Sequence, residues 1–303
     1  MKKIILAAVM VLLSVNTIKA CEICGCSHGN YYIGLFPQFK HKFIGVRYQY
    51  SRFNTVMTDD PSQFSKDYFK TVELWGGWNI GKRWQVIAIL PFNFVHQVSD
   101  DGTTNRQGLG DVAAMMNYKI FDRTTALSGN GNLRQQFWFG AGIKLPTGKF
   151  DIDATDQAIV ALANTQTGTA STDFMLNGIY NVQVNKFGIN TGASYKMNTA
   201  NKDKYSFGNK FSARTFLSYK TGTRNLAVIP NIGFRYESTA INKLDKEKIA
   251  QTGGNLFTGV AGLELNFKTI TIGTNLQLPI SQHFASGQTE MKTRGMVHLT
   301  FGF

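Results

Sequence analysis

The sequence predicts an all-β fold, namely a transmembrane antiparallel up-and-down β-barrel of about 12 strands that follows a short N-terminal periplasmic segment. Three observations carry this prediction. Segments of about a dozen residues alternate apolar and polar side chains along most of the chain. The connections between them are short and long in turn. The last segment, 291–303, has one apolar and one basic face and ends on an aromatic residue.

The closing segment shows most directly what a barrel strand needs. Alternate side chains of an extended strand point to opposite faces. One face carries Val297, Leu299, Phe301 and Phe303, and the other carries Lys292, Arg294, His298 and Thr300. The pattern fits a strand with lipid on one side and a polar lumen on the other. It resembles the closing strand of bacterial outer-membrane barrels, which implies recognition by the barrel assembly machinery through Phe303. The alternative is the last strand of a soluble sandwich.

The composition fits the same fold class. Charged residues make up 17% of the 303 residues and aromatic residues 13%, and the chain has 30 glycines. After the N-terminus, no apolar run approaches the roughly 20 residues that a membrane-spanning helix needs. The net charge of +13 suits partners of negative charge, such as outer-membrane lipid and lipopolysaccharide. We expect no nucleic-acid partner for an exported chain.

Residues 1–20 have the features of a secretory signal peptide. Lys2 and Lys3 form a basic start, an apolar stretch follows to Val15, and a cleavage site fits after Ala20. The apolar stretch is too short to cross a bilayer as a helix. Export from a Gram-negative cell therefore ends, for a barrel of this kind, in the cell outer membrane.

Residues 21–40 form a Cys-rich segment before the first strand. Cys21, Cys24, Cys26 and His28 offer four soft ligands for Zn²⁺ or Cu⁺. Cys21 could instead carry a lipid anchor, and Cys24 and Cys26 could form a disulfide in an oxidising compartment. An inert segment is the remaining alternative, and metal analysis of untagged protein with reduced thiols separates the metal site from the others. We expect the segment to pack at the periplasmic mouth or to enter the lumen as a plug.

The barrel domain is expected over residues 41–303. The predicted strands are 41–53, 67–80, 83–97, 109–121, 134–146, 169–183, 186–198, 207–220, 225–239, 254–267, 269–281 and 291–303. An even number of strands places both ends of the barrel in the periplasm.

The connections alternate in length, as those of outer-membrane barrels do. Short ones are predicted at 81–82, 185, 221–224 and 268. Long, polar ones are predicted at 54–66, 98–108, 147–168, 199–206, 240–253 and 282–290. One predicted connection, Asp122–Leu133, is long on the periplasmic side and breaks the rule. Loop 147–168 contains an apolar run, which predicts either a short helix over or inside the pore or a packed loop.

The charged residues of the predicted strands fall almost entirely on one face. This pattern favours a barrel, because an Arg or Lys on the lipid face at mid-bilayer costs about 2–4 kcal/mol. Lys70 is the exception, near a strand end. The residues predicted to line the lumen and take part in transport are Arg47, Glu73, Asp111, Lys144, Asp173, Lys196, Arg214, Arg235, Glu264, Arg294 and His298. Local weakening of the sheet is predicted at Pro91, Pro146, Pro230 and Pro279.

Three Gly-rich motifs carry a resemblance to a known family. They are Gly108–Val112 (GLGDV), Gly140–Gly148 (GAGIKLPTG) and Gly168–Asp173 (GTASTD). In this order and spacing they resemble the MetA-pathway of phenol degradation family, whose members are outer-membrane barrels labelled as transporters. The resemblance runs from about residue 80 to the C-terminus. Ala170 stands where the family pattern has a glycine, and the Cys cluster lies outside that pattern.

These observations predict an outer-membrane channel or transporter for small solutes. Its mixed-charge lumen has a basic excess, so it favours small anions or amphipathic acids. Gating is expected from the N-terminal segment or from loop 147–168. We expect no enzyme, no catalytic residue and no cofactor. The alternatives are a metal-handling protein that uses the cluster from Cys21 to His28, and a barrel lipid hydrolase built on His283 and Ser286, although no GxSxG motif is present.

Overall fold

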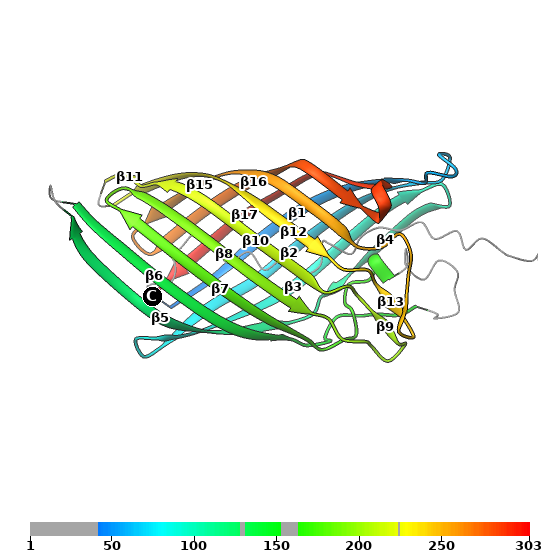
Figure 1. Ribbon diagram of the computed structural model, residues 1–303, viewed down its shortest axis with the longest axis horizontal. Coiled ribbons are helices and arrows are strands. Elements are labelled where there is room, and N and C mark those ends of the chain that lie inside the picture. Colours follow the sequence, from blue (N-terminus) through cyan, green and yellow to red (C-terminus); the bar gives the residue numbers. More distant parts are fainter. Residues whose placement is uncertain (1–41, 128–130, 153–162, 224) are drawn as a thin grey trace, which may run out of the picture.

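The computed structural model describes residues 42–127, 131–152, 163–223 and 225–303 as a single closed antiparallel β-barrel (Figure 1). The main sheet has 14 strands. β4 and β5 follow one another along the wall beside β3 and count as one barrel strand, and β11 has only two residues and is not counted, so twelve strands build the barrel. None of the helices in the described ranges is long and apolar enough to cross a membrane.

The strand bounds agree closely with the alternation in the sequence. The barrel strands are β1 (Phe43–Val56), β2 (Phe64–Ile80), β3 (Trp84–Ser99), β4 (Gly102–Leu109) with β5 (Ala113–Leu127), β6 (Gly131–Lys144), β7 (Asp173–Val184), β8 (Phe187–Met197), β10 (Lys210–Tyr219), β12 (Ala227–Thr239), β15 (Gly254–Phe267), β16 (Ile270–Phe284) and β17 (Thr289–Gly302). The two-residue strand β11 (Thr221–Gly222) extends the turn before β12.

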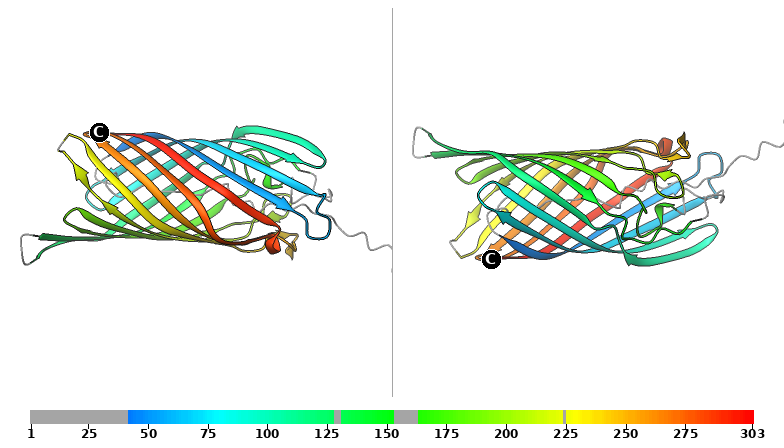
Figure 2. Two further views of the ribbon diagram at one scale, coloured as in Figure 1. Left: turned by 90° about the horizontal axis from the view of Figure 1, so that it is seen from above. Right: turned by 90° about the horizontal axis from the view of Figure 1, so that it is seen from below.

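The barrel closes where its last strand meets its first. β17 pairs with β1 from Phe43 opposite Gly302 to Thr55 opposite Thr289, with one register shift at Arg52 and Phe53. The C-terminus therefore lies at the end with the short turns (Figure 2). At the opposite end, two long loops add a small sheet of β9 (Tyr205–Ser206), β13 (Lys243–Leu244) and β14 (Glu247–Lys248). The short 3₁₀ turn η2 (Ala285–Gly287) joins β16 to β17 at that end.

Successive residues of the strands alternate between a lipid-facing surface and a polar interior. Val46 is 48% exposed, whereas the next residue, Arg47, is 1% exposed. The exposed apolar side chains form a continuous outer surface that includes Ile44, Leu74, Leu90, Phe139, Leu176, Ile232, Leu276 and Leu299. Such a surface is stable in lipid and would be unfavourable in water, since many large apolar side chains are exposed together on it.

Outward-facing aromatic pairs collect near the short-turn end. The rings of Trp78 and Phe303 lie 5.6 Å apart, and those of Trp84 and Tyr118 lie 4.7 Å apart. Phe187 and Tyr219 make a third pair at 4.9 Å. Aromatic side chains in this position form the interfacial girdle that is typical of transmembrane barrels.

The barrel interior also contains apolar clusters, so it is partly filled. Phe43, Trp75, Ile87, Met115 and Trp138 belong to a buried cluster inside the short-turn half. A second cluster near the loop end includes Phe53, Phe69, Leu256, Phe284 and Met291. A narrow barrel is expected to fill its interior with side chains in this way.

The structure corrects two predicted connections. Asp122–Leu133 is not a long periplasmic loop, because β5 and β6 stay paired from Ala113 opposite Lys144 down to Leu127 opposite Gly131. This hairpin projects beyond the rest of the barrel at the end where the C-terminus lies (Figure 2). The predicted loop 98–108 contains β4, which pairs with β3 although its residues have no apolar alternation.

The four prolines have different effects. Pro279 lies opposite the register shift at Phe257 and Thr258, so the predicted local weakening of the sheet is confirmed there. Pro91 lies where β3 changes its partner from β5 to β4. Pro230 is paired with Leu263 in regular register, and Pro146 follows the end of β6.

Candidate functional site

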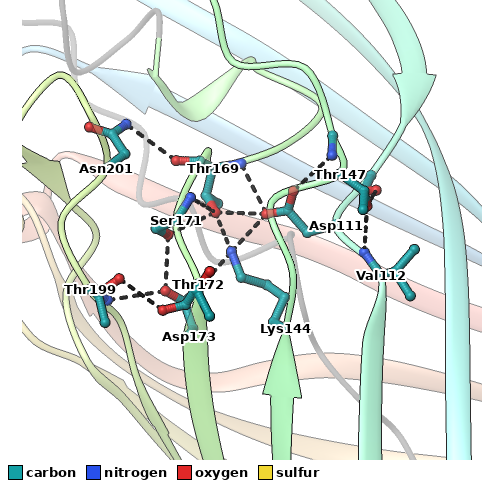
Figure 3. A network of polar contacts seen from close by, with 12 residues as sticks. Asp111, Val112, Lys144, Thr147, Thr169, Ser171, Thr172, Asp173, Thr199 and Asn201 are labelled. Carbon is teal, nitrogen blue, oxygen red and sulfur yellow. Dashed lines mark hydrogen bonds and ion pairs between the residues drawn. The ribbon is translucent and has the colours of Figure 1, made fainter.

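A buried polar network lies inside the wall where β5, β6 and β7 meet (Figure 3). Lys144, at the end of β6, places Nζ 2.7 Å from Asp111 Oδ2 and 2.8 Å from Asp173 Oδ2. All three side chains are almost fully buried. Charges inside a protein are stable only with partners that satisfy them, so one ammonium group between two carboxylates is a well-matched arrangement.

Residues that follow loop 147–168 complete this network. The Thr169 backbone N–H donates to Asp111 Oδ2 at 3.0 Å, and the Thr169 hydroxyl contacts both Asp111 and Lys144. Ser171 Oγ donates to Asp173 Oδ1 at 2.9 Å, and the backbone N–H of Thr199 donates to the same oxygen at 3.1 Å. Figure 3 shows these contacts converging on the two carboxylates.

The network fixes loop 147–168 against the inner face of the barrel. Asn93, which faces inward on β3, donates from Nδ2 to the Thr167 carbonyl at 2.8 Å. The Thr147 hydroxyl accepts from the Val112 N–H and donates to the Gly110 carbonyl, both at 2.9 Å. The three Gly-rich motifs of the sequence therefore meet at one place, on the edge of β4 that no strand covers among the described residues.

Apolar contacts hold the described ends of this loop among its neighbours. Phe150, Ala163 and Tyr205 form a buried cluster, and Phe207 and Leu244 pack against it. The loop ends are thus packed between the two other long loops and the barrel interior. Residues 153–162, with most of the apolar run, lie outside the described residues, so the helix prediction for that run stays a prediction.

A second charged cluster centres on Glu237 of β12. Lys210 Nζ, Arg235 Nη2 and Arg294 Nη1 lie 3.0, 3.1 and 2.6 Å from the Glu237 carboxylate oxygens. Arg294 comes from β17, which β15 and β16 separate from β12, so its contact with Glu237 passes over the inner side of two strands. All four side chains are buried. One carboxylate thus contacts three cations.

Cations also face each other along the wall beside this cluster. Arg214 on β10 is directly opposite Arg235 on β12, and Lys210 on β10 is opposite Lys196 on β8. Lys196 Nζ lies 3.8 Å from Asp173 Oδ2, which links this wall to the first network. Like charges directly opposite each other on neighbouring strands are destabilising unless negative charge lies nearby.

A third group of polar residues lies toward the short-turn end. Arg47 and Glu73 form a buried ion pair across β1 and β2. His298 Nε2 lies 3.9 Å from Glu264 Oε1, at the edge of ion-pair distance. The Arg47 guanidinium also lies over the Trp75 ring, 5.0 Å from its centroid.

Cavities lie inside the barrel and at its mouth. One, of about 50 Å³, lies between β5, β7, β8, β10 and β12, and its lining includes Lys196, Lys210, Arg214 and Arg235. Another, of about 580 Å³, lies at the short-turn mouth, and its lining includes Lys119, Asp122, Arg134 and Trp138. In the second, Asp122 forms a bidentate pair with Arg134, with N···O distances of 2.9 and 2.8 Å.

The predicted lumen residues all lie on the inner face of the wall, in separate groups. Asp111, Lys144, Asp173 and Lys196 are joined in the first network, and Arg235 and Arg294 contact Glu237. Their role in transport stays a prediction. Lys70 lies on the outer face, as the sequence indicates. The cysteines, His28, the signal peptide and segment 21–40 lie outside the described residues.

Sequence reasoning missed Lys210 and Glu237. Glu237 shares its strand face with Arg235, and Lys210 shares its face with Arg214, so the same parity argument contained the signal. The residues in the described ranges contain no group of three or more His, Cys, Asp or Glu side chains that could hold a metal ion. His283 and Ser286 lie at the end of β16 and in η2, and no hydrogen bond between their side chains is found in this part of the structure.

The fold and the charged interior define the class of protein: the chain is an outer-membrane β-barrel. It belongs to the family described as "Putative MetA-pathway of phenol degradation", whose model matches residues 53–274. The match begins before residue 80 and ends before the C-terminus, the two limits expected for the resemblance from the sequence. A search of curated protein sequences finds no match.

Solved structures share the barrel. The COG4313 outer membrane channel from Pseudomonas putida F1 superposes with a TM-score of 0.62 at 14% identity, over 87% of this chain and 96% of that chain. The β domain of the Bordetella autotransporter BrkA gives a TM-score of 0.49 at 8% identity, over 87% of this chain and 100% of that domain. At these identities the first likeness concerns the fold alone, and the second carries no further argument.

Proposed function

We propose that the protein is an outer-membrane channel for small solutes. The observation that supports this most strongly is the division of the wall into an apolar outer face and an inner face that carries at least seven buried or half-buried cations and their carboxylate partners. A barrel that served only as an anchor would have no need of charged groups throughout its interior, because buried charge is costly to maintain.

The channel should favour anions over cations. The interior cations include Lys196, Lys210, Arg214, Arg235 and Arg294. Asp173 contacts Lys196, and Glu237 contacts Lys210, Arg235 and Arg294. Rings and rows of basic side chains select anions, since they lower the electrostatic energy of an anion at the narrowest part of the path.

Loop 147–168 is one candidate for the part of the chain that controls flow. Its described ends are held inside the barrel by Asp111, Asn93 and Gly110, and these ends pack against two other loops. Segment 21–40 is a second candidate for a gate, which rests on its sequence alone.

The proposal is tested by planar-bilayer recording of the refolded full chain. Steady currents that carry more Cl⁻ than K⁺ are the expected result. The matched variant is Thr169→Val, which removes the hydroxyl contacts to Asp111 and Lys144 and leaves all charges in place; it should raise the frequency of open-state fluctuations. A folded barrel that carries no current would contradict the channel function.

Two further statements belong to the proposal. The proposed channel function includes no catalytic step. The assembly machinery recognises β17 through its terminal aromatic residue, which lies outward against Trp78 at the short-turn end.

A further inference from the structure

The cavity between β5, β7, β8, β10 and β12 has two chemically unlike walls. Its lining from β8, β10 and β12 carries four cationic side chains, namely Lys196, Lys210, Arg214 and Arg235. Its lining from β5 and β7 carries Met115, Met175 and Ile179, which are buried members of the apolar cluster inside the barrel. A solvent-filled passage for hydrated ions has no need of the second wall.

The cationic wall holds more positive than negative charge. Glu237 contacts Lys210 and Arg235 and also Arg294, so its single negative charge is divided among three cations. Asp173 is closer to Lys144, at 2.8 Å, than to Lys196, at 3.8 Å. An additional anion in the cavity would reduce the repulsion between Arg214 and Arg235 and between Lys210 and Lys196, which lie opposite each other.

Small residues line the cavity beside these cations. Gly192 on β8 is in close contact with Arg214, because a Cβ added there would lie 3.4 Å from Arg214 Nε, so the missing side chain accommodates the guanidinium. Ser194 and Ser212 also line the cavity and can donate hydrogen bonds to an anionic head group. Arg side chains bind carboxylate and sulfate groups in a bidentate manner, which adds orientation to the charge attraction.

We propose that this cavity binds a compact amphipathic anion, whose carboxylate or sulfate lies among Lys196, Lys210 and Arg214 and whose apolar body lies against Met115, Met175 and Ile179. The inference rests on the proposed channel function and names the solute class that its interior selects. A neutral apolar molecule would leave the cationic wall without added negative charge, and a small inorganic anion would leave the apolar wall unused.

The test uses octanoate as the probe, with the folded full chain in lipid nanodiscs. Bound radiolabelled octanoate is measured by equilibrium dialysis, with empty nanodiscs subtracted. Octanol and octyltrimethylammonium have the same apolar chain and differ in charge. Octanoate should bind saturably, and both comparators should bind at least about tenfold more weakly, since a hydrogen-bonded charge contact contributes on this scale.

Variants then locate the site. Arg214→Gln should weaken octanoate binding about tenfold. The matched control is Lys220→Gln, which removes one positive charge from the exposed turn after the same strand and should leave binding unchanged. Met175→Asn should weaken octanoate binding and spare the binding of acetate to the cationic wall. If Arg214→Gln fails to fold, judged by its heat-modifiable gel mobility, Lys196→Gln and the comparator ligands still decide the question.

The inference is overturned if octanol binds as well as octanoate, or if the folded Arg214→Gln variant binds octanoate like the unaltered chain. Conductance separates this failure from that of the channel function. If the protein conducts but does not bind octanoate saturably, the channel function stands and the proposed binding site is wrong. If the protein binds octanoate at this site but never conducts, the binding site stands and the channel function is wrong.

Discussion

Gly148 and Gly168 approach each other backbone to backbone, at the two ends of loop 147–168. A Cβ built on Gly168 would be 2.5 Å from the Gly148 Cα, and one built on Gly148 would be 2.6 Å from the Gly168 Cα. Contacts this short do not occur between real atoms, so only glycine fits at either position. This close approach brings Thr169 to Asp111 and so joins the loop to the ion network.

Gly168→Ala should therefore detach loop 147–168 from the wall without unfolding the barrel. The expected result is faster proteolytic cleavage within the loop and a larger mean current. Gly178→Ala is the matched control, because its added Cβ would meet Phe137 at 3.7 Å, an ordinary contact. Equal cleavage rates for the two variants would show that the close glycine contact does not hold the loop.

Lys144→Met should destabilise the barrel strongly. It removes the cation between Asp111 and Asp173 and leaves two buried carboxylates facing each other, at a cost of about 3–5 kcal/mol in the free energy of unfolding. Urea unfolding in lipid vesicles measures this. Lys149→Met is the control, since the Lys149–Asp151 pair is mostly exposed and its loss should change nothing measurable. Similar losses for both would contradict the role given to the network.

A charge on the outer face should be costly in the middle of a strand and tolerated at its end. Leu276→Arg should lower the free energy of unfolding by about 2–4 kcal/mol, whereas Val56→Arg, at the loop end of β1, should cost about 0–1 kcal/mol. Both side chains are about half exposed on the outer face. Equal effects of the two substitutions would be inconsistent with a lipid-facing belt around the barrel.

Removal of the terminal ring should slow assembly in cells. Phe303→Ala should lower the amount of heat-modifiable barrel in the outer membrane several-fold, with little effect on refolding of the purified chain. Phe267→Ala removes a similarly exposed ring at the same end of β15 and should assemble normally. Assembly of the Phe303 variant at the unaltered level would exclude recognition through this residue.

The alternation of apolar and polar residues predicts well where the strands lie and which side chains point inward. It predicts poorly which inward side chains contact one another. The segment 254–267 was expected from periodicity and is β15 with the same bounds. Parity placed Arg235 and Arg294 inside the barrel, but the contact of Arg294 with Glu237 depends on strand order and register, which bring β17 near β12. Those relationships involve residues far apart in the sequence, which a local pattern does not encode.

Two other features of the structure could not be predicted from the sequence, for physical reasons. β4 has a polar sequence because it forms part of a hairpin near the loop end, where an apolar outer face is not needed. The position of Thr167 inside the barrel follows from the glycine contact and from Asn93, which belongs to a strand more than seventy residues earlier in the chain. The family motifs marked these glycines without indicating that they meet.

The most direct test of the account is the reversal potential of the refolded full chain in a planar bilayer under a KCl gradient. A channel lined by Lys196, Lys210, Arg214 and Arg235 should pass Cl⁻ in preference to K⁺, and the preference should fall in Arg214→Gln and remain in Lys220→Gln. A folded barrel that stays silent, or one that prefers K⁺, would contradict the proposal of an anion-selective outer-membrane channel.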